Sequence, residues 1–100
     1  MLRMITRVTD DTARPRLSPK VRLRFDRRTG RSLLLYPERG LELNETATEI
    51  AHRCTGESTV ADMVQHLAQI YADVSPGDIT REVDDFLTAL ADRGLLRNMP

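Results

Sequence analysis

The stretch RSLLLYP, residues 31–37, is apolar on both sides of an extended chain, and this restricts the fold more than any other feature. Side chains of a strand alternate between two faces, so Leu33 and Leu35 lie on one face while Leu34 lies on the other. Apolar groups on both faces are typical of a strand at the centre of a sheet. The stretch therefore predicts a central strand that ends at Pro37, since proline has no N–H to donate to a neighbouring strand.

Segments on either side of this stretch supply the two neighbours that a central strand needs. In VRLRFD, residues 21–26, apolar and charged side chains alternate, which predicts a strand with one buried face. The connection RRTG contains Gly30, which can adopt a left-handed turn conformation. After a second turn, PERG, residues 40–43 repeat the alternation with two leucines on one face. The sequence thus predicts a three-stranded antiparallel meander.

Three helices are predicted after the meander, and each has a recognisable beginning. Asn44, Thr59 and Ser75 are polar residues of the kind that cap the first turn of a helix. Thr59 is followed three residues later by Asp62, as in a capping box, and Ser75 is followed by Pro76, which is favoured at the first helical position. The order βββααα predicts an α+β fold that resembles a winged helix-turn-helix, with the meander followed by a three-helix bundle.

The chain has 100 residues, of which 40% are hydrophobic, and this suffices for one small core. Residues 14–100 are expected to form a single domain, and residues 1–13 an N-terminal tail that is flexible or forms a strand. The lone Cys54 excludes a disulfide within the chain and favours a cytoplasmic location. No apolar run approaches the roughly 20 residues of a membrane-spanning helix, so no membrane association is expected.

The net charge of zero conceals an uneven distribution along the chain. Residues 1–40 contain eleven basic and four acidic side chains, a net charge of +7, and residues 41–100 carry −7. A basic tail and sheet beside an acidic helical part could complement one another, or could form a docking surface for a charged partner. Both uses remain open at this point, together with the simpler interpretation that the charged faces are only solvated.

Candidate catalytic and metal-binding groups are few and poorly arranged. His52 and His66 have no further ligands at the spacing of a four-ligand metal site. Cys54 falls on the apolar face of a predicted helix and has no obvious base to activate it. Asp84 and Asp85 are adjacent on a helix, so their side chains point about 100° apart and cannot act on one substrate atom. The sequence favours a non-catalytic binding module without a cofactor or a metal.

DNA is the first partner to consider for a winged helix-turn-helix, because the last helix of such a fold can enter the major groove. The third predicted helix, residues 76–93, carries five acidic and two basic side chains. A net charge of −3 on a recognition helix would repel phosphates. We therefore expect no nucleic acid partner, and the alternative function of a winged-helix DNA-binding regulator would have to use the basic residues of the tail and first hairpin instead.

A peptide suits the predicted fold better than DNA does. The edge of the last strand offers unpaired backbone groups, to which an extended peptide can add as a further strand. Four or five such hydrogen bonds, at a net ~1 kcal/mol each, barely meet an association cost of ~4 to 15 kcal/mol. Side-chain contacts must therefore contribute, and the third helix would supply them if it lies beside this edge.

Four segments that together span most of residues 14–96 carry a resemblance to a known family: RPRLSPKVRLRFD, RSLLLYPERGLELNETATEI, STVADMV and DFLTALADRGLL. They resemble PqqD, the small peptide chaperone of pyrroloquinoline quinone (PQQ) biosynthesis. This family is the free-standing form of a recognition element found in pathways of ribosomally made, modified peptides. The resemblance implies that the leader of the precursor peptide PqqA adds to the edge strand and lies against the last helix. It also implies that the domain presents the peptide to the radical S-adenosylmethionine (SAM) enzyme PqqE.

The resemblance further implies which residues bind the peptide. They form the edge strand and part of the last helix: Arg39, Gly40, Leu41, Glu42, Leu43, Arg81, Glu82, Val83, Asp85 and Phe86. No chemistry and no cofactor are implied for this subunit, since the iron–sulfur clusters belong to the enzyme. The tail of residues 1–13 lies outside the resemblance. Its alternating apolar side chains could form a strand that occupies a sheet edge, and exchange of that strand between two copies would give a homodimer.

Overall fold

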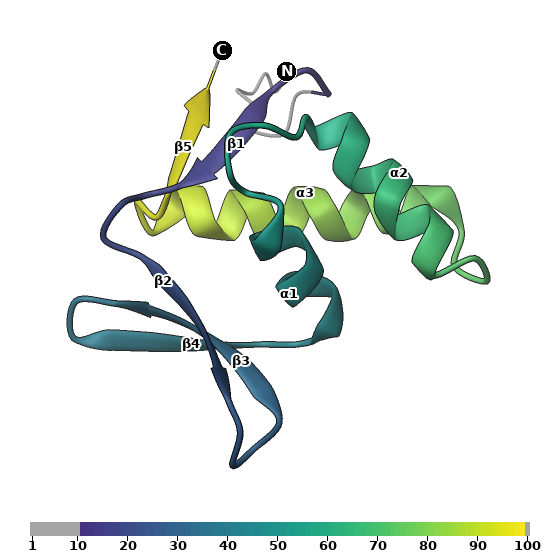
Figure 1. Cartoon of the computed structure of the whole chain (residues 1–100). Helices are drawn as coiled ribbons and strands as arrows, with labels where there is room; N and C mark the ends of the chain where they lie inside the picture. The colour runs from purple at the N-terminus through teal and green to yellow at the C-terminus, as the bar shows by residue number, and fades with distance from the viewer. Residues whose placement is uncertain (1–10, 100) are drawn as a thin grey trace.

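The structure, a computed structural model, describes residues 11–99 of the chain and begins with short strands. Its elements are β1 (Arg14–Leu17), β2 (Arg22–Asp26), β3 (Arg31–Tyr36), β4 (Arg39–Leu43), α1 (Glu45–His52), α2 (Val60–Ile70), α3 (Pro76–Asp92) and β5 (Leu96–Met99) (Figure 1). The predicted α+β fold is confirmed, because a three-stranded antiparallel sheet in the order β2-β3-β4 precedes the helices. Most of the predicted N-terminal tail lies outside the described residues.

The register of the sheet follows from the alternation of side chains. Leu34 of β3 pairs with Leu23 of β2 on one side and with Leu41 of β4 on the other. These three leucines share the inner face of the sheet, and Leu34 is fully buried there. β3 is the central strand, as its two apolar faces predicted. β4 therefore lies at one edge of the sheet and β2 at the other.

Two turns of the meander place a residue in the left-handed region. Gly30 ends the connection between β2 and β3 with φ 73°, as glycine does readily. Glu38, between β3 and β4, has φ 65°, which is unusual for a residue with a side chain. The second turn is shorter than the predicted PERG, because β4 already begins at Arg39.

The three helices begin where their capping residues predicted. The side-chain oxygens of Asn44, Thr59 and Ser75 accept hydrogen bonds from the first turns of α1, α2 and α3. Thr59 and Asp62 form the complete capping box. Among residues 11–99, no helix combines the length and the apolar composition that a membrane span requires.

A second, two-stranded sheet was not predicted from the sequence. β1 and β5 pair antiparallel, with Arg16 opposite Arg97 and Leu17 opposite Leu96, and they bring the two ends of the described chain together (Figure 1). Backbone N–H groups of Leu17 and Gly56 extend this contact by donating to the carbonyls of Cys54 and Pro15. β1 thus lies against the loop that follows α1.

The core consists of two groups of buried side chains that share half-buried neighbours. The group between the helices includes Met63, Leu67, Val83 and Leu87. The group beneath the sheet comprises Leu34, Leu43, Ala51, Leu90 and Leu95. Phe86 of α3 packs against both groups. α3 therefore connects the helical layer to the sheet and holds β4 in a defined position relative to the helices.

Candidate functional site

β4 has one paired edge and one free edge among the described residues. Its hydrogen-bonding neighbour is β3, and no other strand of residues 11–99 joins it. Arg39, Gly40 and Glu42 are exposed, whereas Leu43 is only 4% exposed and anchors the strand in the core. The strand is thus fixed by its inward side chains while backbone groups on its outer edge remain available for pairing.

A groove begins where β4 ends. Asn44 directly follows the strand, and the hollow that it lines has a volume of about 270 Å³. We call this hollow the α1–α3 groove, and its lining residues are Asn44, Ala47, Ile50, Glu82, Asp85 and Phe86. Leu43, at the end of β4, belongs to the same core group as Leu90 of α3. The free edge and the α1–α3 groove therefore form one continuous candidate site.

The candidate site continues along α3 into a smaller hollow of about 80 Å³. This hollow lies between the start of α1, the end of α2 and the start of α3, and its lining includes Thr46, Val74 and Ile79. Glu82 lines both this hollow and the α1–α3 groove. Val74 is 38% exposed, so an apolar surface remains open at the far end. A guest peptide that extends from the end of β4 into these hollows would contact Asp85 and Phe86 first and Val74 last.

The five predicted residues of α3 do not all face the α1–α3 groove. Glu82, Asp85 and Phe86 line the α1–α3 groove. Val83 is fully buried in the core, so its side chain does not line the groove. The guanidinium of Arg81 forms an ion pair with Asp78 at 3.2 Å on the exposed surface, and Arg81 lines neither hollow of the candidate site. The predicted part of Val83 and Arg81 in peptide binding therefore stays a prediction without support from the lining of the groove.

Carboxylates dominate the charge of the groove wall. Glu82 and Asp85 are both exposed, and neither takes part in any ion pair that we find among residues 11–99. The apolar surface beside them comes from Phe86, Ala47 and Ile50. This combination suits a guest that carries an apolar side chain next to a basic one. Because the carboxylates are exposed, their attraction for a cation is modest and weakens with salt.

The histidines and the single thiol of the described residues lie outside any cluster that could hold a metal ion. No cluster of three or more His, Cys, Asp or Glu side chains that could hold a metal ion occurs there. Burial raises the pKa of the Cys54 thiol from 9.0 to about 12, and its Sγ lies 3.4 Å from the carbonyl oxygen of Ile50. A protonated, buried thiol is a poor nucleophile. His66 contacts Glu49 at 3.2 Å and Arg53 at 3.3 Å, so it links α2 to α1.

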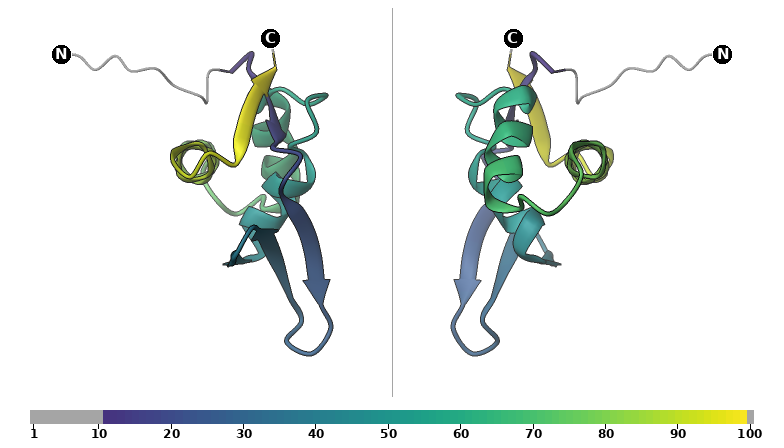
Figure 2. Two further views of the ribbon diagram at one scale, coloured as in Figure 1. Left: turned by 90° about the vertical axis from the view of Figure 1, so that its left-hand side faces the viewer. Right: turned by 90° about the vertical axis from the view of Figure 1, so that its right-hand side faces the viewer.

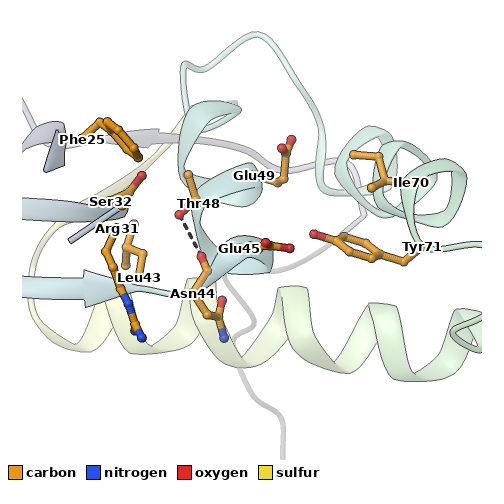
Figure 3. A pocket seen from close by; sticks show the side chains of 11 residues that line it. Phe25, Arg31, Ser32, Leu43, Asn44, Glu45, Thr48, Glu49, Ile70 and Tyr71 are labelled. Atoms are coloured by element: carbon orange, nitrogen blue, oxygen red, sulfur yellow. Dashed lines mark hydrogen bonds between the residues drawn. The ribbon is translucent and has the colours of Figure 1, made fainter. Parts of the chain in front are cut away.

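A third and larger hollow, of about 660 Å³, lies on the other side of α1 (Figure 3). Its walls come from the β2–β3 hairpin, the start of α1 and the end of α2, and they include Phe25, Arg31, Glu45 and Tyr71. No sequence feature predicts this site. The alternation along β2 predicts that Phe25 lies on the buried face, but Phe25 is 64% exposed, and no local signal indicates that the core stops short of it.

Comparisons with known proteins place this geometry in context. Residues 31–96 match the family model described as Coenzyme PQQ synthesis protein D (PqqD). The matched region begins at β3 and ends at the start of β5, so it contains β4, the α1–α3 groove and all three helices.

Several curated proteins are similar over most of the chain. A PqqA binding protein of Rhodopseudomonas palustris (strain TIE-1) is 40% identical over 86 residues, which cover 86% of this chain and 83% of that protein. A PqqA binding protein of Xanthomonas oryzae pv. oryzae (strain PXO99A) is 37% identical over 83% of this chain and 89% of its own length. The bifunctional coenzyme PQQ synthesis protein C/D of Methylorubrum extorquens is 37% identical over 82% of this chain but only 22% of its own length.

A solved structure shares the fold. It is the solution NMR structure of the PqqD truncation of Methylobacterium extorquens PqqCD, described as a stand-alone recognition element for ribosomally synthesised and post-translationally modified peptides. The TM-score is 0.71 with 36% sequence identity, and the match covers 83% of this chain and 87% of the other.

Proposed function

The chain belongs to the PqqD family, and from this premise we propose that it is a non-catalytic peptide chaperone in PQQ biosynthesis. Its proposed guest is the PqqA precursor peptide, which the names of its relatives support. The single observation that carries the proposal is the free edge of β4 beside the α1–α3 groove. A peptide added to this edge would satisfy backbone groups of residues 39–43 and would place side chains against α3.

Strand addition explains why both parts of the candidate site are needed. Each backbone hydrogen bond contributes a net ~1 kcal/mol, and the edge of a five-residue strand offers only a few outward groups. Association costs ~4 to 15 kcal/mol, so the edge alone binds weakly. Burial of an apolar guest side chain against Phe86 adds ~1.5 to 3 kcal/mol. The groove therefore provides both the additional affinity and the selection of sequence.

Eight of the ten predicted residues have a part in the proposed complex. Arg39, Gly40 and Glu42 would act through their backbone groups along the guest strand, since their side chains do not line the groove. Leu41 and Leu43 hold β4 against the core beneath the sheet. The guest's side chains would meet a groove wall made by α3: Glu82, Asp85 and Phe86.

We further propose that the loaded domain delivers PqqA to the radical SAM enzyme PqqE. The iron–sulfur chemistry would belong wholly to that enzyme. The occurrence of a similar domain within a bifunctional coenzyme PQQ synthesis protein supports action beside other proteins of the pathway. The cytoplasm is the proposed location, where the lone Cys54 would remain reduced.

DNA binding is not favoured by any feature of α3. The exposed carboxylates on this helix include those of Asp78, Glu82, Asp85 and Asp92. A phosphate backbone approaching α3 would be repelled by them, so the helix is unsuited to the major groove.

Calorimetric titration with a synthetic PqqA leader tests the proposal. We expect saturable binding at one peptide per domain, and faster cross-linking of PqqA by PqqE when the domain is present. A domain that shows no heat of binding and no effect on the enzymatic rate would contradict the proposal. A scrambled peptide of the same composition is the control for non-specific charge attraction.

The proposal for residues 1–13 concerns assembly. If this tail adds as a strand to a second copy, the domain forms a homodimer. Sedimentation of the full chain and of a chain lacking residues 1–13 distinguishes the cases. We expect the truncated form to sediment as a monomer and the full chain as a dimer. Equal masses for the two forms would rule out association through the tail.

A further inference from the structure

The β2–β3 hairpin projects away from the rest of the domain. Figure 2 shows its tip extending beyond the helices, opposite the end of the molecule where β1 and β5 pair. The connection of residues 27–30 forms the tip, and all four of its residues are exposed. The projecting tip does not contribute to the core, because the buried contacts of this hairpin come from Leu23 and Leu34 near its base.

The projecting hairpin is strongly basic. Residues 20–31 contain six basic side chains and one acidic side chain, a net charge of +5. Among residues 11–99, two of these cations form ion pairs, Arg28 with Asp26 at 3.7 Å and Arg31 with Glu42 at 3.6 Å. The side chain of Arg28 is 89% exposed, so its pair is weak. Most of the positive charge on the hairpin is therefore available to a partner.

An apolar surface lies directly beside this charge. Phe25 is 64% exposed and Ile70 is 46% exposed, and both line the hollow of about 660 Å³ between the hairpin and the helices (Figure 3). Among residues 11–99, three large apolar residues are exposed, Phe25, Ile70 and Val74, and the first two line this hollow. Isolated exposed apolar side chains are ordinary, but a group of them in a hollow indicates a contact surface.

This surface differs from most of the proposed guest site, although Asn44 also lines the α1–α3 groove and Tyr71 also lines the hollow of about 80 Å³. The hollow uses Glu45, Thr48 and Glu49 of α1, whereas the α1–α3 groove uses Ala47 and Ile50. The hairpin's outer strand is β2, at the opposite edge of the sheet from β4. A guest on β4 and a partner on the hairpin can therefore be bound at the same time.

We propose that this hairpin face, made of Phe25, Arg27, Arg28, Arg31, Ile70 and Tyr71, docks a partner protein that presents an acidic patch around an apolar contact. Phe25 is the apolar anchor, and the arginines attract the acidic patch. Glu45 and Glu49 form the opposite wall of the hollow and confine the partner's carboxylates to the hairpin side. A folded protein can place its carboxylates beside the arginines and none beside Glu45 and Glu49, because its charges are localised. A continuous phosphate backbone would also approach these two glutamates and be repelled by them.

The inference rests on the proposed function only for its probe, which is the enzyme PqqE immobilised for kinetic binding measurements. Phe25→Ser should weaken binding at least tenfold, mainly through faster dissociation. The double variant Arg27→Glu/Arg28→Glu should slow association at least tenfold at low salt. Arg14→Glu/Arg97→Glu makes the same change of charge on exposed residues of the β1–β5 pair and should bind normally. Thermal melting of every variant confirms that it is folded.

Three outcomes would overturn the inference. The first is normal PqqE binding by both hairpin variants, and the second is an equal loss of binding in the charge-matched control. The third is that PqqE does not bind, while a duplex DNA probe binds the wild type but not the Arg27→Glu/Arg28→Glu variant, which would assign the face to nucleic acid instead. Titration of the same variants with PqqA leader keeps the two proposals apart. If the hairpin variants bind both the peptide and PqqE as the wild type does, the hairpin proposal is refuted and the chaperone function is not. If the wild-type domain binds no peptide, the chaperone function is refuted.

Discussion

Asn44, which follows β4 and caps α1, lines the same groove as Phe86 of α3. Asn44 therefore places the end of the free edge of β4 beside the part of α3 that lines the groove. An extended peptide on β4 would run directly towards Phe86. This relationship is the structural basis for assigning residues 39–43 and the wall of the groove to one peptide site.

The acidic wall of the groove predicts a charge preference. Glu82→Lys should weaken binding of the PqqA leader about tenfold, which corresponds to ~1.4 kcal/mol, because it removes attraction for a basic guest side chain. Glu82 is exposed, so the free energy of unfolding should change by less than ~0.5 kcal/mol. Asp92→Lys is the matched control, since it makes the same change at the exposed end of α3. If calorimetry gives equal affinities for Glu82→Lys and the wild type, the assignment of Glu82 is wrong.

The cap at the start of α1 predicts a local loss of stability. The Oδ1 atom of Asn44 accepts a hydrogen bond from the backbone N–H of Ala47 at 2.8 Å. Asn44→Ala should lower the free energy of unfolding by about 1 kcal/mol, while Asn44→Asp retains the acceptor and should cost only a few tenths. Urea denaturation measures both. Equal destabilisation by the two substitutions would show that the cap contributes little.

The turn before β4 predicts a stabilising substitution. Glu38 adopts φ 65°, a conformation that costs an L-residue with a side chain roughly 1 kcal/mol. Glu38→Gly should therefore raise the free energy of unfolding by up to ~1 kcal/mol, reduced by the greater freedom of glycine in the unfolded chain. Glu38→Val should lower it, because a β-branched residue tolerates this conformation poorly. A melting temperature lowered by the glycine would contradict the proposed strain.

The buried thiol predicts slow labelling and a loss of stability at high pH. Because the pKa of Cys54 is raised from 9.0 to about 12, the folded protein should react very slowly with iodoacetamide at pH 8. An exposed thiol, Cys54→Ala/Ala72→Cys, should react rapidly under the same conditions. The unfolded chain loses the proton near pH 9 while the folded chain keeps it. Stability should therefore be unaffected by this group below pH 9 and fall as the pH rises towards 12. Rapid labelling of the native protein would contradict this account.

Local signals explain why most of the fold could be predicted. Caps such as Asn44, Thr59 and Ser75 act on the turn that follows them, and alternation along β3 reports its two neighbours. The β1–β5 pair has no such signal. Its strands have four residues each and come from opposite ends of the chain, and Pro15 argues against a strand when read alone. Only the folded core brings these two segments together.

The candidate site was predictable to a smaller degree for a related reason. Arg81, Glu82 and Val83 are consecutive on a helix, so their side chains leave it in three directions. A resemblance to a family identifies the helix but does not decide which of the three faces a guest. Packing decides it, since Val83 points into the core and Glu82 into the groove. The hollow beside Phe25 depends similarly on how far the core extends under the sheet.

The most direct test of the central claim is amide chemical-shift mapping during titration with the PqqA leader. The account predicts the largest changes at residues 39–43, at Asn44 and along α3 at Glu82, Asp85 and Phe86. Amides of β4 that exchange with solvent in the free domain should become protected as the guest strand pairs with them. Changes confined to the β2–β3 hairpin, with residues 39–43 unaffected, would contradict strand addition at β4.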